Sequence, residues 1–284
     1  MRISWLIPLL WGCGTTRPDD VIECGPGETH RMVVSTLAFT LPDESGYING
    51  FDLDGHVTSS GESEGCGHAD MVSPDGVEGI DSAFSNLAPV LDLIGASQVE
   101  DYLQTAIDSG ELLLILEISD LDAPLSAELT DQCATLTLSR ASGEPFIGTD
   151  NTLLSDQTFH QDHDAPATSP VVVQIEDGVL RAEGIDLTLP VQLLDEYVTL
   201  IINQSNFHIT FDTDSNASGY FAGGLPVDVL EQRLSEIEDI GDLSEVIPEM
   251  VGSAADLYPD DSGACTDLSL GLDFVSKPVF FYDE

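Results

Sequence analysis

Hydrophobic residues recur at every second position through much of the second half of this chain. The segment Ile185 to Leu193 shows the pattern most strictly, with apolar residues at all of its odd positions. Such a pattern is typical of a strand with one buried face. Residues 112–118 are apolar on both faces and predict a fully buried strand. The predicted strands cover residues 32–41, 112–118, 133–139, 171–175, 185–193, 198–202, 207–211, 219–224 and 268–274.

Two local signals indicate how these strands connect. The pair Asp177-Gly178 lies between two apolar runs, which favours a tight β-hairpin. Further on, the apolar positions are even in 198–202 and odd in 207–211. A shift of one residue exchanges the two faces of a strand, so residues 203–206 are predicted to form a turn or a bulge.

Other segments have the three- and four-residue spacing of amphipathic helices. The clearest begins at Ser97, where Ser97 and Glu100 are spaced as a capping box, and ends at Gly110. An earlier helix is predicted to begin at Ser82 and to be kinked or restarted by Pro89.

Two further helices are predicted late in the chain, over 227–237 behind a proline and over 243–254 with Asp242 as N-cap. Together the elements predict a mainly β protein, α+β overall, in which an antiparallel sandwich or open barrel carries two helical hairpin insertions. A single domain is expected over residues 24–284, with the loop-rich stretch 143–170 as the best candidate for a subdivision.

The charge balance narrows the classes of partner. The chain of 284 residues has 52 Asp and Glu against 7 Lys and Arg, a formal net charge of −45. Such a surface repels phosphate backbones, which argues against nucleic-acid binding, and it disfavours anionic membranes unless a lipid holds the protein there. The excess of acidic residues has two interpretations. It can keep the protein soluble in a salty exterior, or it can provide a set of divalent-cation sites. The spread of the acidic residues over the whole chain favours the first interpretation.

Residues 1–12 are predicted to be a signal peptide. Arg2 is a minimal positive region, and Ile3 to Leu10 is a mostly apolar run too short to span a bilayer. The run ends in Leu10-Trp11-Gly12-Cys13, which resembles the lipobox of bacterial lipoproteins. The resemblance implies lipidation of Cys13, and residues 13–23 then form a polar spacer before the domain.

Trp11 departs from the small residue usual at that position of a lipobox, and the alternative is an ordinary export signal with Cys13 as a chance neighbour. In either case the protein is expected to be exported. Beyond Cys13 the chain has four cysteines, an even number, which in an exported chain predicts two disulfides with three possible pairings. Cys24–Cys66 with Cys133–Cys265 is favoured, because the second pair joins two similar strand-like runs.

Calcium is the cofactor that the acidic residues suggest. The stretch 50–84 is rich in Asp and Gly, and carboxylates close to turns suit a hard cation that takes several oxygen ligands. The pattern does not fit an EF-hand loop, and the simpler alternative is that Asp-Gly pairs only form turns. The candidate calcium ligands are Asp52, Asp54, Asp70, Asp75 and Asp81, with Asp260 and Asp261 in a second acidic turn.

Histidines offer two weaker metal candidates. His56, Cys66 and His68 could bind a transition metal with Asp70, although a disulfide would compete for the thiol. His160 and His163 would share a face on a helix, but their surroundings favour a loop.

Enzyme signatures are mostly absent: the sequence has no nucleophile elbow, zinc-protease motif, P-loop or dinucleotide fingerprint. The many acids leave a secreted carboxylate-dependent hydrolase as one alternative. An apolar-ligand carrier that uses the interior of the sheet is another.

The segments GFDLDG…GC…DG…GIDSAF and DLYPDDSGACTDLSLGLDF, taken with the lipobox, resemble Asp-rich lipoproteins of myxobacterial-type Gram-negative bacteria. The resemblance implies a lipid-anchored cell-envelope protein and carries no catalytic residues. Gly14, rather than Asp, after the lipidated cysteine implies the outer membrane. The expected function is a non-enzymatic binding or structural module whose partner is another envelope protein or a surface ligand.

Overall fold

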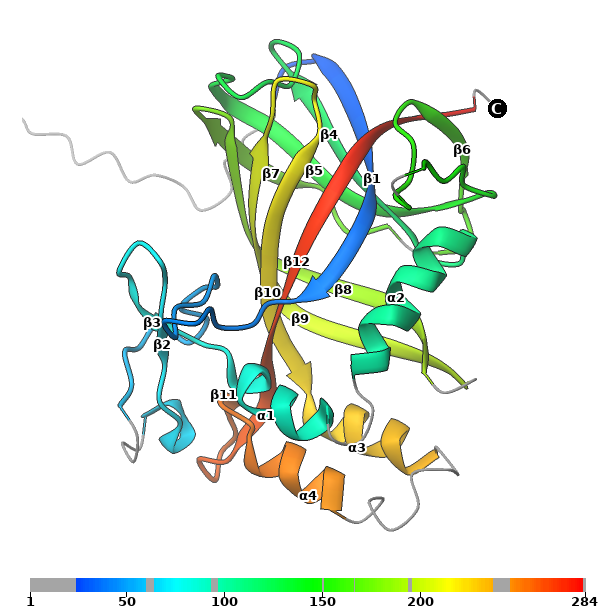
Figure 1. Ribbon diagram of the computed structural model, residues 1–284. Helices are drawn as coiled ribbons and strands as arrows, with labels where there is room; N and C mark the ends of the chain where they lie inside the picture. Colours follow the sequence, from blue (N-terminus) through cyan, green and yellow to red (C-terminus); the bar gives the residue numbers. More distant parts are fainter. Residues whose placement is uncertain are drawn as a thin grey trace, which may run out of the picture.

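A closed antiparallel barrel of eight strands forms the body of the molecule (Figure 1). The computed structural model describes residues 24–59, 64–92, 97–149, 151–165, 167–193, 196–236 and 246–282. The predicted signal peptide, Cys13 and the spacer lie outside these residues. In order around the ring, the strands are β1 (Glu28–Phe39), β4 (Leu113–Leu121), β5 (Asp131–Ser142), β7 (Val171–Glu176), β8 (Val179–Leu193), β9 (Glu196–Phe211), β10 (Ala217–Pro226) and β12 (Cys265–Phe281).

The prediction of a mainly β protein is confirmed, and the structure has a barrel in place of a sandwich. The barrel is closed and not open, because β12 pairs with β10 on one side and with β1 on the other. Closure leaves the ring without an unpaired edge. Each strand neighbours the next ring strand along the chain, so the ring follows a simple up-and-down order.

A second ring of pairings shares one wall with the barrel. Strand β6 (Gln157–Gln161) pairs with both β5 and β12, and these strands are already joined through β1 and β4. The shared wall is therefore covered on both faces. Leu116 points to the same side as Met32, whereas Ile115 points to the opposite side with Val33, and all four are buried. The prediction that residues 112–118 form a strand buried on both faces is confirmed.

Aromatic side chains fill the centre of the barrel. Phe207 and Phe221 face each other across β9 and β10 with ring centroids 5.0 Å apart, and Phe274 of β12 lies 6.2 Å from Phe221. Gly219 makes room for this packing, since a Cβ there would lie 2.0 Å from the carbonyl oxygen of His208. The phenylalanines belong to one continuous core of apolar residues.

The predicted hairpin at Asp177-Gly178 and the predicted turn or bulge at residues 203–206 are both confirmed. Asp177 and Gly178 have positive φ angles of 49° and 73° and join β7 to β8 in a two-residue turn. The change of phase across 203–206 is a bulge: β9 continues through it, Gln204 has a φ of 51°, and the register with β8 and β10 shifts nearby.

The described residues include four helices outside the barrel: α1 (Ala83–Asp92), α2 (Ser97–Ser109), α3 (Val227–Glu236) and α4 (Val246–Ser253). They follow the predicted positions, although the predicted N-cap Asp242 and the joins between paired helices lie outside the described residues. Helix α1 continues through Pro89. None of the described helices is long and apolar enough to cross a membrane.

Helix α2 contacts β1 and β8, which stand opposite each other in the ring. The side chain of Ser97, one half of the predicted capping box, lies outside the described part of the structure. The Glu100 carboxylate accepts a hydrogen bond from the backbone N–H of Phe39 at 2.7 Å, and so caps the end of β1. Helix α1 also packs at this end of β1, with the rings of Phe84 and Phe39 4.6 Å apart.

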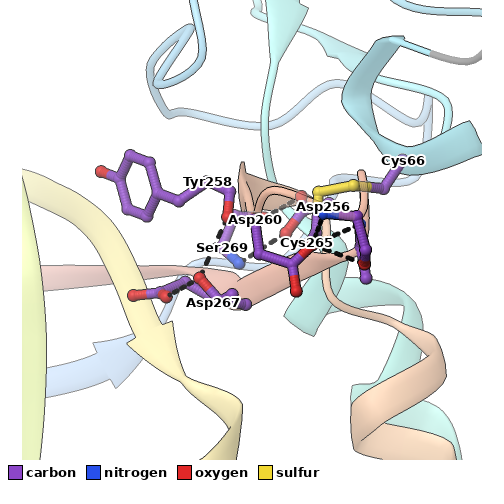
Figure 2. The surroundings of a disulfide bond; sticks show 10 residues. Cys66, Asp256, Tyr258, Asp260, Cys265, Asp267 and Ser269 are labelled. Atoms are coloured by element: carbon purple, nitrogen blue, oxygen red, sulfur yellow. Dashed lines mark hydrogen bonds between the residues drawn. A yellow bond between two sulfur atoms is a disulfide. The ribbon is translucent and has the colours of Figure 1, made fainter.

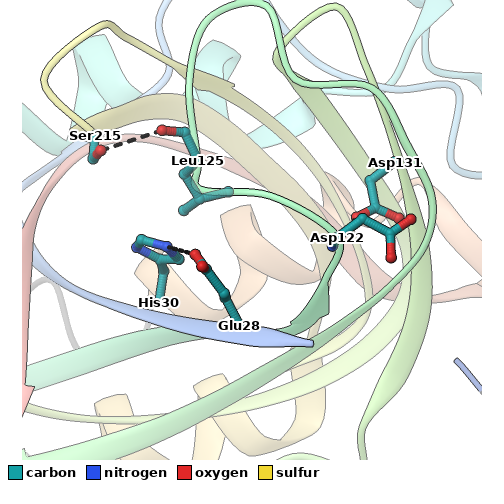
Figure 3. Close-up of polar contacts among 6 residues, drawn as sticks. All are labelled: Glu28, His30, Asp122, Leu125, Asp131 and Ser215. Atoms are coloured by element: carbon teal, nitrogen blue, oxygen red, sulfur yellow. Dashed lines mark hydrogen bonds and ion pairs between the residues drawn. The ribbon is translucent and has the colours of Figure 1, made fainter. Parts of the chain in front are cut away.

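The opposite mouth of the barrel is polar (Figure 3). His30 Nε2 lies 3.6 Å from a carboxylate oxygen of Glu28. The loop between β4 and β5 folds over this end, where the Ser215 hydroxyl donates to the carbonyl of Leu125 at 3.2 Å and Asp131 accepts from the backbone of Asp122. Leu125 is buried by this arrangement.

Residues 41–81 form a small lobe beside the barrel, between β1 and α1 (Figure 1). In the described part of this segment, the regular structure consists of a 3₁₀ turn, η1 (Glu64–Gly67), and the two short strands β2 (Met71–Val72) and β3 (Glu78–Ile80). The buried apolar residues of the lobe include Ile48 and Ile80, and neither belongs to the two larger hydrophobic clusters of the molecule. We refer to residues 41–81 as the lobe below.

Candidate functional site

Three carboxylates converge inside the lobe. Asp52, Asp54 and Asp81 each offer an oxygen, and these atoms all lie within 4.8 Å of one another. Asp52 and Asp54 lie where the chain bends at residues 53–55, and Asp81 directly follows β3, where its backbone N–H bonds to the carbonyl of Phe51. Among the described residues, this is the group of acidic, histidine or cysteine side chains whose geometry suits a metal ion.

Asp81 is the buried member of the cluster, with 3% of its surface exposed. The pKa of Asp81 is raised to about 8, mainly by burial. The backbone N–H of Leu53 favours the charged form and partly offsets this rise, and the neighbouring charges of Asp54, Asp256 and Asp70 add smaller increases. Leu53 donates to Asp81 Oδ2 at 2.6 Å. A carboxylate in this position is costly to ionise unless a cation is present.

Asp70 lies at the edge of the same group. Burial raises its pKa, and repulsion from Asp54 and Asp52 raises it as well. Its carboxylate accepts the backbone N–H of Thr58, and its own N–H bonds back to the Thr58 carbonyl. The Thr58 hydroxyl is buried without a hydrogen-bond partner in the described part of the chain, so an unused oxygen donor adjoins Asp70.

The same aspartates also shape the turns of the lobe. Asp52 Oδ1 accepts from the backbone of Gly55 at 2.6 Å, and Asp54 Oδ1 accepts from His56 at 2.8 Å. These bonds are those of Asx turns, so the turn-forming interpretation of the sequence holds for both residues. Each carboxylate has a second oxygen that these turns do not use.

The other predicted calcium ligands lie elsewhere. Asp75 is exposed in the turn between β2 and β3. Asp260 caps the turn before β12, where its Oδ1 accepts from the backbone of Ser262 and Ala264, and the Ser262 hydroxyl bond lowers its pKa. Asp261 is exposed in the same turn. The acidic turn at 260–263 is therefore a structural turn, separate from the cluster.

All four predicted disulfide cysteines are paired, but the favoured pairing is wrong. The structure joins Cys24 to Cys133 and Cys66 to Cys265. The start of β1 runs beside β4, with Glu28 opposite Leu121, and this pairing brings the preceding residues to the neighbouring strand β5. The order of strands in the sheet therefore brings Cys24 close to Cys133, and the spacing of the cysteines along the sequence does not show this order.

The Cys66–Cys265 disulfide joins η1 of the lobe to the first residue of β12 (Figure 2). It removes the Cys66 thiolate from any metal set, so the predicted transition-metal group of His56, Cys66, His68 and Asp70 is wrong. His160 lies on β6 and stacks on Tyr282 with ring centroids 4.5 Å apart. The second predicted histidine pair is therefore not on a helix.

Beneath this disulfide lies a buried polar contact that the sequence analysis missed. Asp256 accepts from both the backbone N–H and the hydroxyl of Ser269, at 2.7 and 2.5 Å, and Ser269 Oγ accepts the N–H of Ala83 at 2.6 Å. Burial raises the pKa of Asp256 to about 6, while the Ser269 bonds and nearby His68 lower it. The sequence does carry one indication that Asp256 is buried. Asp256 follows two alanines and precedes a leucine, which is an apolar setting for an acid.

A pocket of about 380 Å³ opens beside the disulfide, lined in part by His68 and Ser253. The Ser253 hydroxyl donates to the carbonyl of Met250 within α4. Asp256 uses both carboxylate oxygens on Ser269. The described residues around this pocket therefore do not form the linked nucleophile, base and acid of a hydrolase.

Comparisons with known proteins add no family or fold relative: no family model, curated protein or solved structure matches this chain. The assignment of function therefore depends on the geometry of the site.

Proposed function

We propose that the protein is an exported, lipid-anchored component of the cell envelope that acts as a non-enzymatic binding or structural module, with a lobe stabilised by calcium. The anchor is a lipid on Cys13, and the outer membrane is the proposed site. The partner is another envelope protein or a surface ligand. Calcium holds the lobe in one conformation next to the barrel.

The convergence of Asp52, Asp54 and Asp81 is the observation that carries the calcium proposal. The donors are all oxygen atoms, which suit calcium and not a soft transition metal. A cation there would offset the cost of ionising buried Asp81. Asp70 and the Thr58 hydroxyl are adjacent groups that would extend the donor set. When bound, calcium would supply a positive charge that links the Asp52–Asp54 segment to the end of β3.

Export is supported by the two disulfides, which form and persist in oxidising compartments. The net charge of −45 suits an exterior in which salt or divalent cations screen it. The filled barrel interior counts against the apolar-ligand carrier, and the separate hydrogen-bonding roles of Asp256 and Ser253 count against a hydrolase site in the pocket.

The calcium proposal is tested by calorimetry and thermal unfolding of the chelator-treated protein. We expect calcium to bind and to raise the melting temperature, and Asp81→Asn to abolish both effects. Asp75→Asn is the matched control, because Asp75 is an exposed acid of the same lobe outside the cluster. No binding heat in the wild type, or equal binding by Asp81→Asn, would overturn the proposal.

The anchor is tested separately by growth with a radioactive fatty acid. We expect the label on the wild type and its loss in Cys13→Ala, with the protein shifting from the membrane fraction to the soluble one. A Cys13→Ala variant that retains the label would exclude Cys13 as the lipidated residue.

A further inference from the structure

The Cys66–Cys265 disulfide forms part of the wall of a pocket of about 380 Å³. The rest of the lining is made mainly of small residues, including Gly252, Ser253 and Gly263, together with the imidazole of His68. Both cysteines are partly exposed, and together with these small residues they border the pocket. Exchange of a disulfide requires a thiolate to reach one of its sulfur atoms, so access is one of the factors that set the rate.

The same disulfide is a main attachment of the lobe to the body of the molecule. The lobe has two short strands, and its buried residues Ile48 and Ile80 lie outside both large hydrophobic clusters. One aromatic contact also joins lobe and barrel, between Phe51 and Tyr220 with ring centroids 5.2 Å apart. A segment of this size with so small a core depends on cross-links for its order.

The other disulfide has a different setting. Cys24 precedes β1 and Cys133 lies within β5, so their bond fixes the N-terminal end of the domain to the barrel wall. A Cβ on Gly27, three residues after Cys24, would lie 2.3 Å from the carbonyl oxygen of Leu121, so the chain that enters β1 packs tightly against the end of β4. Opening this bond would release the chain before β1 and leave the lobe in place.

From these observations we propose that Cys66–Cys265 is a redox-reactive latch, opened by a dithiol reductant that enters the pocket and closed again by the reverse exchange with a disulfide oxidant. A thiolate of the reductant attacks one sulfur, the Cys66–Cys265 bond breaks, and the departing sulfur takes up a proton. The second thiol of the reductant then displaces the other cysteine. The protein gains two electrons and two protons as two thiols, and the reductant leaves as a disulfide.

His68 also lines this pocket, two positions after Cys66. The neighbouring acids Asp260 and Asp261 carry negative charge, which disfavours a bare thiolate at this place.

The chemical test is graded reduction of the folded wild type with dithiothreitol in chelator, followed by alkylation and mass spectrometry of each cysteine. We expect Cys66 and Cys265 to be alkylated at least tenfold faster than Cys24 and Cys133. Equal rates for the two bonds, or faster opening of Cys24–Cys133, would overturn the proposal.

The structural consequence is tested by hydrogen exchange on the partly reduced protein. We expect amides of residues 41–81 to lose protection while those of the barrel strands keep it, which also shows that the barrel remains folded. The double variant Cys66→Ser/Cys265→Ser should reproduce this result without reductant, whereas Cys24→Ser/Cys133→Ser should not. A lobe that stays protected after the bond opens would refute its role as a latch. Because chelator is present throughout, these results do not depend on calcium binding.

Discussion

The backbone N–H of Phe39, the last residue of β1, donates to the side chain of Glu100 on α2 at 2.7 Å. The bond ties the helix to the end of a barrel strand 61 residues earlier in the chain. It also satisfies a backbone donor at the point where β1 ends, next to the contact between Phe39 and Phe84.

Replacement of Glu100 by Ala should therefore lower the free energy of unfolding by about 1–3 kcal/mol, because a partly buried N–H loses a charged acceptor. Glu100→Gln keeps an oxygen acceptor and should lose less than Glu100→Ala. Urea unfolding of the two variants measures the difference. If both variants lost the same free energy of unfolding, the hydrogen bond to Phe39 would not be the source of the stabilisation.

The aromatic centre of the barrel should dominate its stability. Phe221→Ala removes a fully buried ring that packs on Phe207 and Phe274 and should cost about 3–5 kcal/mol. Phe280→Ala is the matched control, because Phe280 is 56% exposed on β12 and its loss should change stability by no more than about 0.5 kcal/mol. Denaturant unfolding of both variants checks this, and similar losses would contradict a filled interior.

Asp256 should make stability fall as pH rises. Burial raises its pKa from 3.8 to about 6, so the folded protein holds this proton more tightly than the unfolded chain. Its stabilising contribution is full below the unfolded pKa and is lost as pH rises through the folded pKa, a change of up to about 3 kcal/mol. Asp256→Asn should flatten this slope relative to the wild type, whereas the exposed Asp261→Asn should not. The measurement is the free energy of unfolding of the wild type and both variants from about pH 4 to 7.

Calcium binding should release protons near neutral pH. Burial raises the pKa of Asp81 to about 8, so this carboxyl holds a proton at pH 7 in the calcium-free protein. A bound cation requires the ionised form, so the apparent affinity should rise up to about tenfold per pH unit and level off above pH 8. Calorimetry in buffers of different ionisation enthalpy gives the number of protons that are released when calcium binds. An affinity that is constant from pH 6 to 8 would exclude Asp81 as a ligand.

The local pattern of the sequence predicted most elements because it reports local geometry. Alternation predicted β8, β9 and β12, and the pair Asp177-Gly178 predicted the turn before β8. The change of phase at 203–206 located the bulge in β9. These features depend on neighbours within a few residues, whose periodicity is set by the backbone.

The candidate site was predicted only in part. The sequence placed Asp52, Asp54 and Asp81 in one acidic stretch, but could not separate them from Asp75, whose spacing looks equally suitable. Convergence in space distinguishes Asp52, Asp54 and Asp81 from Asp75, and this convergence depends on how the lobe folds. Asp256 and Ser269 were missed because their hydrogen bonds join β12 to the segment before β11 (Leu257–Pro259).

By itself, the sequence determined the strand and helix segments, the acidic surface, and the presence of two disulfides from an even number of cysteines. The tertiary structure alone decided that the sheet closes, that Cys24 pairs with Cys133 and Cys66 with Cys265, and that three of the seven candidate aspartates converge. Periodicity is a property of the local chain, whereas closure and pairing depend on residues more than a hundred positions apart. Such contacts are selected by the packing of the whole barrel, which leaves no mark on the spacing of any one segment.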